Sequence, residues 1–354
     1  MITSLVVVVV MIVIAVALVL MGLVTSISKF VRARHDRVQE HRYQELRPRL
    51  LAAIDDRTIR LNLSPRDEKA LISIARNLLS AVRGAEREAV VDVLEREGVV
   101  NAAVRQTHAR AAVRRARAVE LLGCAGVERA APSLRQLLDD RDFDVRRSAA
   151  RALGFIGHPG AIPDLLRAVD SGRIPLNTIT MAIARIGPLG TGALVDGCGY
   201  GSPLVRATCA ELLGLNGTTH AQRTLTSLLR SDENLEVRIR AARALGRVGA
   251  PTSVDPLAEA LRETEPAALR AVAAKALGNI GGVRTISVLR DALNAPQPMV
   301  ARNAAYALAA VGPAAHDTLQ LAARGRANSR SSYAREALSV QHLNELVAVR
   351  RGGG

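Results

Sequence analysis

Residues 235–249 read LEVRIRAARALGRVG and decide the fold, because the same phrase returns throughout the chain. Its general form is Val-Arg-x-x-Ala-Ala-x-Ala-Leu-Gly-x-x-Gly. The Leu or Ile near its end, here called the anchor, recurs eight times at intervals of 30–32 residues. The anchors are Leu122, Leu153, Ile183, Leu213, Leu245, Leu277, Leu308 and Leu338. A fixed period of this length is typical of solenoids, in which each unit buries its apolar face against its neighbours.

Each repeat is predicted to be a pair of helices. In residues 219–249, Leu225, Leu228 and Leu229 have helical spacing and are followed by the turn signal Ser231-Asp232. A second helical pattern is formed by Val237, Ala241, Ala244, Leu245 and Val248. We expect Gly246 and Gly249 to close this second helix, because glycine adopts the left-handed cap conformation at little cost. The trailing glycine recurs at Gly126, Gly157, Gly187, Gly217, Gly281 and Gly312. No stretch alternates convincingly with period 2, so the prediction is an all-α fold.

The phrase, its period and the Arg after its leading Val resemble the short bacterial HEAT-like repeats first noted in phycobilisome lyase subunits. The resemblance covers about Arg105 to Gln341. It implies an α-solenoid of about eight HEAT-like helical hairpins of ~31 residues each. It implies little about function, because this fold hosts adaptors, a few lyases, hydroxylases and DNA glycosylases.

The recurrent arginine of the phrase has two interpretations. It stands at Arg115, Arg146, Arg206, Arg238 and Arg270, and is replaced or displaced at Leu176, Arg302 and Ser331. It could form a row of anion-binding groups. Alternatively, it could bond a carbonyl or an acid of the adjacent turn, such as Asp144 or Glu236, and so link the repeats in a ladder. In HEAT-like families this position is structural, and the resemblance therefore favours the ladder.

The amino-terminal segment Leu5–Val24 is twenty residues without a charge. As a helix it would be ~30 Å long, enough to cross a bilayer, so residues 1–28 are predicted to be a transmembrane helix. The alternative is a cleaved signal peptide ending near Val24-Thr25-Ser26, although such peptides have a basic start and only ~7–15 apolar residues. The charges just after the segment predict an amino terminus outside and a solenoid on the cytoplasmic face of the inner (cell) membrane. These charges are Lys29, Arg32, Arg34 and Arg37.

The rest of the chain divides by composition. Residues 29–60 are predicted to be a basic juxtamembrane helix, broken at Pro48, and a linker, with anionic lipid as a partner. Residues 61–104 are predicted to form a helical cap, which begins at Ser64-Pro65 and contains two helices, Ala70–Val82 and Ala85–Glu97. A cap covers the exposed apolar end of a solenoid. The repeats then fill residues 105–342, and residues 343–354 are predicted to be a tail.

The net charge of +15 and the pI near 11.1 raise nucleic acid as a partner. Three observations oppose it. Aromatic residues are 2% of the chain, with no Trp to stack on bases. A membrane anchor is an unusual tether for a DNA enzyme. The charge also forms no continuous stripe, because the position two before the anchor carries both signs. That position reads Glu120, Arg151, Met181, Glu211, Arg243, Lys275, Tyr306 and Glu336.

This mixed surface suits a protein partner better than a phosphate backbone. The predicted partner-binding groove combines the position two before the anchor with the position six before it. Its residues are Arg147, Arg151, Glu211, Arg243, Lys275, Arg302 and Tyr306. Arg and Tyr are enriched among the residues that dominate binding at protein interfaces. The alternative interpretation is an ordinary solvated face.

Motifs for chemistry are missing from the sequence. The seven histidines are scattered over different repeats, and no H-E-x-x-H, C-x-x-C or G-x-S-x-G occurs. The glycine clusters Gly187–Gly192 and Gly197–Gly201 lack the strand and the Gly-Lys-Ser/Thr ending of a phosphate loop. We interpret them as a loosened junction, a candidate hinge between the third and fourth repeats. The three cysteines have no bridge or metal spacing. We therefore predict no catalytic, cofactor-binding or metal residue.

The sequence thus predicts a membrane-anchored cytoplasmic scaffold that binds a protein partner without doing chemistry. The partner is expected to reside in the membrane. An enzyme of envelope or polysaccharide synthesis is one hypothesis, because small anchored repeat proteins often serve such machines. The alternatives are a nucleic-acid-binding HEAT-like solenoid and a repeat-fold lyase.

Overall fold

The computed structural model describes Met21 and residues 41–56, 58–61, 63–64, 67–82, 84–325 and 329–352. Within these ranges every regular element is a helix, which confirms the all-α prediction. The chain divides into two compact units, residues 1–125 and 126–354, and each is described by itself. Apart from Met21, the predicted transmembrane helix lies outside the described residues, as do Lys29, Arg32, Arg34 and Arg37.

The described part of unit 1 contains a helix over residues 41–55 and four further helices. These are α2 (Glu68–Ala81), α3 (Gly84–Arg96), α4 (Val99–Gln106) and α5 (Ala112–Ala125). The predicted helical pair is thus present as α2 and α3, and α2 packs against α5, the helix that carries the first anchor. The start of α2 differs from the prediction. The Asp67 carboxylate accepts hydrogen bonds from Ser64 N (2.9 Å) and Ser64 Oγ (2.6 Å), and the helix begins only after Asp67.

The helix over residues 41–55 contradicts the predicted break at Pro48. Leu46, Leu50 and Ala53 follow one another at helical spacing and are all buried. A proline inside a helix costs about 3 kcal/mol, and burial of this apolar stripe offsets that cost. The Arg96 guanidinium also donates to the Ala53 carbonyl oxygen at 3.1 Å. From residue 41 onward, the segment predicted to be juxtamembrane therefore packs inside unit 1.

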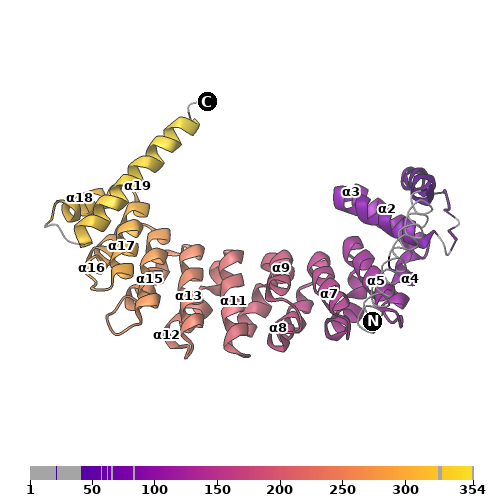
Figure 1. The fold of residues 1–354 in the computed structure, drawn as a ribbon, viewed down its shortest axis with the longest axis horizontal. Helices are drawn as coiled ribbons and strands as arrows, with labels where there is room; N and C mark the ends of the chain where they lie inside the picture. Colours follow the sequence, from indigo (N-terminus) through magenta and orange to yellow (C-terminus); the bar gives the residue numbers. More distant parts are fainter. Residues whose placement is uncertain are drawn as a thin grey trace, which may run out of the picture. The chain divides into compact units, whose positions relative to one another are not determined.

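Unit 2 consists of stacked helical hairpins. The helices that carry the repeat phrase, here called phrase helices, are α7 (Phe143–Ile156), α9 (Leu176–Ile186), α11 (Pro203–Asn216), α13 (Leu235–Val248), α15 (Ala267–Ile280), α17 (Pro298–Val311) and α19 (Ser329–Gly352). The connecting helices are α6 (Ala131–Gln136), α8 (Ile162–Ser171), α10 (Thr191–Gly197), α12 (Gln222–Ser231), α14 (Val254–Glu259), α16 (Val283–Ala292) and α18 (His316–Arg324). From α7 to α17 the phrase helices lie side by side along one edge of the unit (Figure 1).

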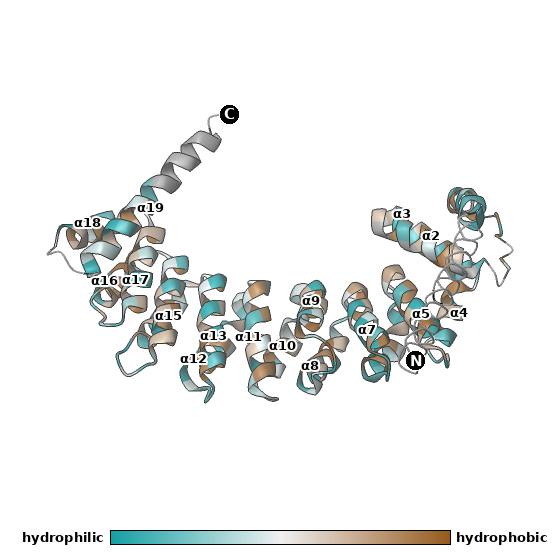
Figure 2. Cartoon of the chain, in the orientation of Figure 1, coloured by the Kyte–Doolittle hydropathy of each residue, from teal (hydrophilic) through white to brown (hydrophobic). Residues whose placement is uncertain are grey.

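The turns between the helices are largely hydrophilic, whereas hydrophobic residues lie along the helices (Figure 2). The anchors Leu153, Leu213 and Leu245 are fully buried between neighbouring helices. The solenoid prediction is confirmed in this unit. Residues 343–352, predicted to belong to a tail, instead continue α19.

Glycines of the phrase have two separate roles. The trailing glycine ends its helix with a positive φ in all seven repeats that have one, for example +71° at Gly249. Gly246, expected to help close the helix, instead lies inside α13. A Cβ on Gly246 would lie 2.7 Å from the Ala276 Cα of α15. The same close approach joins Gly154 to Ala182, Gly214 to Ala244 and Gly278 to Ala307. This glycine is needed because two helix backbones touch there.

The junction between α9 and α11 lacks this close approach. The equivalent positions hold Ala184 and Leu212, which are larger than the Gly and Ala of the four close pairs. The two helices pack over much less of their length than the other neighbouring phrase helices. Gly187 and Gly201, with φ of +68° and +87°, flank the short helix α10 between them. These features support the predicted loosening between the third and fourth repeats.

Among the described residues, one segment is long and apolar enough to cross a membrane, Leu176–Gly197. It is not one straight helix, because it comprises α9, the 3-10 turn η4 (Gly187–Gly190) and α10. Ile179, Ile183 and Leu194 are buried in the stack. Its apolar character is explained by this burial in the third and fourth repeats.

Candidate functional site

The recurrent arginine forms the predicted ladder between repeats. Arg206 donates from Nε and Nη2 to the Asp232 carboxylate at 2.7 and 3.0 Å, and from Nη1 to the Gly201 carbonyl at 3.0 Å. Arg238 bonds the Leu229 carbonyl at 3.0 Å and Glu265 at 2.6 Å. Each arginine thus ties the segment that precedes its own helix to the turn before the next phrase helix.

Two further arginines follow the same pattern with neutral acceptors. Arg270 donates to the Leu261 carbonyl at 3.1 Å and to Gln297 Oε1 at 2.8 Å. Arg146 donates to backbone carbonyls only, including that of Asp140 at 2.7 Å. Where the third repeat has Leu176 in place of the arginine, the Ser202 hydroxyl bonds Asp170 instead.

The acids expected to receive the ladder arginines are used differently. Asp144 pairs with Arg147 at 3.0 Å, and Glu236 pairs with Arg240 at 2.6 Å, each within one helix. Both acids stand in the first turn of their helices, where residues three or four positions further along are in reach. The acids of the ladder stand in the turns before the next phrase helix. The sequence pattern alone did not identify these acids.

Asp232 is the most buried acid of the ladder, with 4% of its side chain exposed. Burial opposes ionisation of its carboxyl. Hydrogen bonds from Arg206 and the Asn234 backbone N–H outweigh that effect and hold the Asp232 pKa below its usual value. The charged pair is therefore part of the folded interface between α11 and α13.

The position two before the anchor forms a row along successive phrase helices. Arg151, Met181 and Lys275 are exposed there, and Glu211 and Arg243 are half-buried. The next member, Tyr306, is half-buried as well. We call these six residues the exposed row. The position six before the anchor is less uniform: Arg147 and Arg302 are exposed, whereas the equivalent residues Ala207 and Ala271 are buried.

Four residues of the predicted groove are engaged inside the protein, and one of them is Arg147, which pairs with Asp144. Arg302 Nη2 and Tyr306 Oη both donate to Glu336 Oε1 at 2.8 Å, which links α17 to α19. Glu211 accepts hydrogen bonds from Arg240 and, at 3.1 Å, from Arg247. Burial opposes ionisation of Glu211, but these two arginines keep its pKa below the usual value. These side chains support the stack and are poorly available to a partner.

Arg151, Arg243 and Lys275 form no ion pair or hydrogen bond with any other described residue. They are the cations of the predicted groove that a partner can reach. Sequence reasoning missed two residues beside them, Phe155 and Arg185, both two places after an anchor. The Arg185 guanidinium lies 4.2 Å from the centroid of the Phe155 ring and bridges α9 to α7. Scanning this second position along the repeats would have found them.

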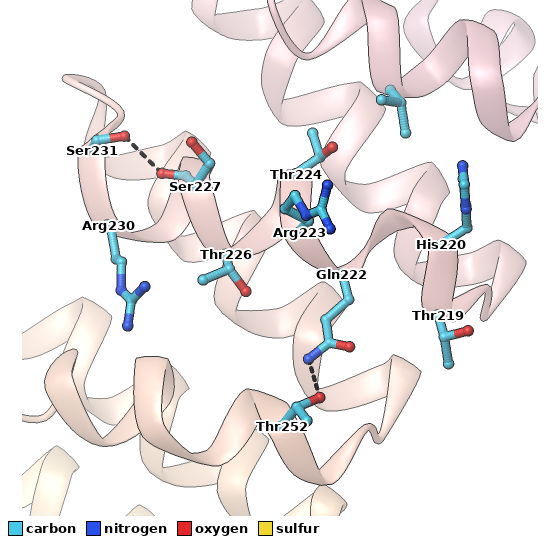
Figure 3. A pocket seen from close by; sticks show the side chains of 11 residues that line it. Thr219, His220, Gln222, Arg223, Thr224, Thr226, Ser227, Arg230, Ser231 and Thr252 are labelled. Carbon is cyan, nitrogen blue, oxygen red and sulfur yellow. Dashed lines mark hydrogen bonds between the residues drawn. The ribbon is translucent and has the colours of Figure 1, made fainter.

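Two hollows on the described surface of unit 2 bear on function. The larger, about 980 Å³, lies along the connecting helix α12 (Figure 3). Hydroxyl and amide groups dominate its lining, and Ser231 Oγ donates to the Ser227 carbonyl at 2.8 Å. His220, Arg223 and Arg230 are its cationic or titratable lining residues, and Arg230 pairs with Glu259 at 2.8 Å. No carboxylate or thiol lines this hollow, so it holds no acid–base pair or metal-ligand set.

The smaller hollow, about 210 Å³, lies between α7 and α9 beside the exposed row. We call it the α7–α9 pocket. Its lining residues are Arg151, Phe155, Asn177, Thr178, Met181, Ala182 and Arg185.

The chemistry-bearing side chains of the described residues do not gather into a metal site, because no group of three His, Cys, Asp or Glu is found there. Cys198 and Cys209 are both buried and adjacent. The hydrogen bond with Cys198, together with burial, raises the pKa of Cys209, so the Cys209 thiol remains protonated and unreactive.

Comparison with known proteins concerns the fold. A family model described as HEAT repeats matches residues 97–184, 193–273 and 254–341. The karyopherin Kap121p bound to the SUMO protease Ulp1p is 15% identical with a TM-score of 0.50, over 78% of this chain and 37% of the karyopherin. Human deoxyhypusine hydroxylase is 22% identical over 78% and 96% of the two chains, with a TM-score of 0.32. The CpcE–CpcF phycocyanin lyase of Nostoc is 22% identical over 71% and 92%, with a TM-score of 0.28. No match is found among proteins of curated function.

Proposed function

Because the chain belongs to the HEAT-repeat family, we propose that it is a non-catalytic scaffold that binds a protein partner along the exposed row. The observation that carries the proposal is the row itself. It places accessible cations (Arg151, Arg243, Lys275) next to an exposed methionine and an internally paired acid on successive parallel helices. Such a surface has mixed charge and apolar contact area, as interfaces between proteins do.

The scaffold is proposed to be anchored in the inner membrane through Leu5–Val24, with its amino terminus outside and its repeats in the cytoplasm. Support comes from the charge-free length of this segment and from the basic residues that follow it. Lys29, Arg32, Arg34 and Arg37 would contact anionic lipid. An anchored scaffold meets a membrane-resident partner at high local concentration, so that modest affinity suffices. An enzyme of envelope or polysaccharide synthesis is one candidate for this partner.

The similarity in fold to a protein-bound karyopherin supports the proposal of a protein partner, but does not identify that partner. The karyopherin with a similar fold is bound to another protein, a SUMO protease. The net charge of +15 favours nucleic acid as the competing partner. In that case affinity would fall steeply with salt, by about 0.9 log units per tenfold rise in salt for each phosphate neutralised. A lyase would carry a chromophore or a metal after purification.

Co-purification tests the proposal. Full-length protein is extracted in mild detergent, washed at rising salt, and its bound material is identified. The variants Arg243→Glu and Lys275→Glu, which disturb no internal bond of the described residues, are compared with wild type. Arg302 is left unchanged, because its reversal would break the bond to Glu336.

We expect a stoichiometric membrane protein that survives the salt wash and is lost from both variants. Nucleic acid eluting steeply with salt, without a stoichiometric protein, would overturn the scaffold proposal in favour of nucleic-acid binding. A coloured or metal-containing preparation would favour the lyase.

A further inference from the structure

The α7–α9 pocket combines two guanidinium groups that form no ion pair or hydrogen bond with other described residues and the apolar side chains of Phe155, Met181 and Ala182, here called its floor. We propose that it binds a short acidic segment of the partner protein. An aliphatic side chain of that segment would lie on the floor, and carboxylates on either side would reach Arg151 and Arg185. The inference rests on the proposed scaffold function, because it states what the scaffold recognises.

The two arginines approach the pocket from different helices. Arg151 is exposed on α7 and has no ion-pair partner among the described residues. Arg185 on α9 lies over the Phe155 ring at 4.2 Å, and this contact fixes its orientation. The guanidinium carbon lies over the ring, and no ion pair or hydrogen bond with another described residue occupies the N–H groups of Arg185. The edge that bears these N–H groups is the part of arginine that recognises a carboxylate.

Local charge selects an acidic ligand. Helix α9 contains no acidic residue, and the one acid of α7, Asp144, already pairs with Arg147 at 3.0 Å. No carboxylate lines the pocket. A basic segment would therefore be repelled, whereas a carboxylate would find two cations that currently face solvent.

The floor and the size of the pocket select a peptide. Met181 is 61% exposed and Phe155 is 42% exposed, and both line the pocket together with Ala182. Exposed methionine adapts its shape to different apolar side chains. The volume of about 210 Å³ is below the ~300–1,000 Å³ typical of small-molecule sites, so the pocket suits one or two side chains of a larger ligand. Asn177 at the rim offers an amide to the peptide backbone.

Nucleic acid fits this place less well. A phosphate backbone requires cations in a continuous row. The next phrase helix, α11, instead presents Glu211 in the exposed row, and the row itself holds no cation between Arg151 and Arg243. Two isolated guanidiniums around an apolar floor match a carboxylate–aliphatic–carboxylate pattern.

The test measures binding of a fluorescein-labelled peptide, with one leucine flanked by glutamates, to the full chain in detergent by anisotropy. Arg151→Gln and Arg185→Gln are each expected to weaken the Kd roughly tenfold, as for loss of one close charge pair. Arg185→Lys keeps the charge but loses the planar edge, and should give an intermediate loss. Arg173→Gln is the matched control, because Arg173 is an exposed arginine of the same repeat outside the pocket. Its Kd should equal that of wild type.

Three results would overturn the inference. The first is no binding of the peptide, and the second is a Kd that neither pocket variant changes. The third is that a leucine-free peptide and a single-stranded oligonucleotide bind as tightly as the leucine-containing peptide. Circular dichroism melting of each variant separates a binding loss from unfolding. Co-purification of the partner with each variant distinguishes failure of the pocket inference from failure of the scaffold proposal. If the partner is retained by Arg151→Gln and Arg185→Gln but lost on reversal of Arg243 and Lys275, the scaffold stands and the pocket assignment is wrong.

Discussion

Gly246 of α13 lies against Ala276 of α15 so closely that a Cβ on the glycine would meet the alanine Cα at 2.7 Å. Neither backbone can move away without opening the stack. Gly246→Ala should therefore destabilise the protein by about 1–3 kcal/mol, the usual cost of overpacking. Urea unfolding followed by circular dichroism measures this loss. Gly192→Ala in α10 is the control, because no atom lies within 4 Å of its added Cβ. It should be neutral or stabilising by up to about 1 kcal/mol. Equal effects of the two changes would contradict the close-packing argument.

Replacing a ladder arginine should lower the free energy of unfolding more when the acid that it pairs with is more deeply buried. Arg206→Ala leaves the Asp232 carboxylate, 4% exposed, without its charged partner. We expect a loss of about 1–3 kcal/mol, the cost of an unsatisfied buried group. Arg230→Ala breaks a pair of similar geometry whose side chains are 50% and 39% exposed. Solvent replaces such a pair easily, so we expect little change in the urea midpoint. A larger effect at Arg230 than at Arg206 would show that the ladder does not stabilise the fold through burial.

Acid should weaken the interface between α11 and α13. The pKa values of Asp232 and Glu211 are lower in the folded protein than their usual values, after the arginine hydrogen bonds have outweighed burial. Their stabilising contribution is therefore complete above the unfolded pKa, near 4, and is lost as pH falls through the lower folded pKa. Urea midpoints measured across this acidic range should fall for wild type. The fall should be smaller for Asp232→Asn. If wild type and Asp232→Asn show the same pH profile, Asp232 does not contribute to the acid sensitivity of this interface.

The α9–α11 junction should be the weakest interface of unit 2. Solenoid stability is roughly a sum of repeat and nearest-neighbour terms, and here Ala184 and Leu212 replace the close Gly–Ala pair. Hydrogen exchange followed by mass spectrometry should show α7–α9 and α11–α17 exchanging as separate blocks, with the lowest protection in α10. Uniform protection across α7–α17 would mean that the junction is as firm as the others.

Thiol reactivity should separate the three cysteines. Cys198 and Cys209 are buried, and the pKa of Cys209 is raised by its hydrogen bond with Cys198 and by burial. Cys124 is partly exposed. A disulfide reagent such as dithiobis(nitrobenzoate) should modify Cys124 quickly in native protein and all three cysteines in denaturant. Cys124→Ala should abolish the fast phase. A fast phase that persists in this variant would place Cys198 or Cys209 in reach of solvent.

Much of the site was not predictable from the repeat pattern. The pattern indicated which residues of each phrase helix are exposed, including Arg151 and Lys275. It did not reveal that Glu211, Arg302 and Tyr306 bond neighbouring repeats, because such bonds depend on the offset between adjacent helices. The contact of Arg185 with Phe155 was missed for the same reason.

The sequence by itself determined the all-α repeat architecture, its period and its left-handed glycine caps, since each follows from residue spacing within one repeat. Only the tertiary structure decided that Gly246 serves helix–helix packing, that Pro48 lies within a helix, and that Arg206 binds Asp232. Each of these depends on distances between segments far apart in the chain. A periodic pattern fixes which face of a helix is buried, whereas the neighbour that each side chain meets is set by how closely the helices pack.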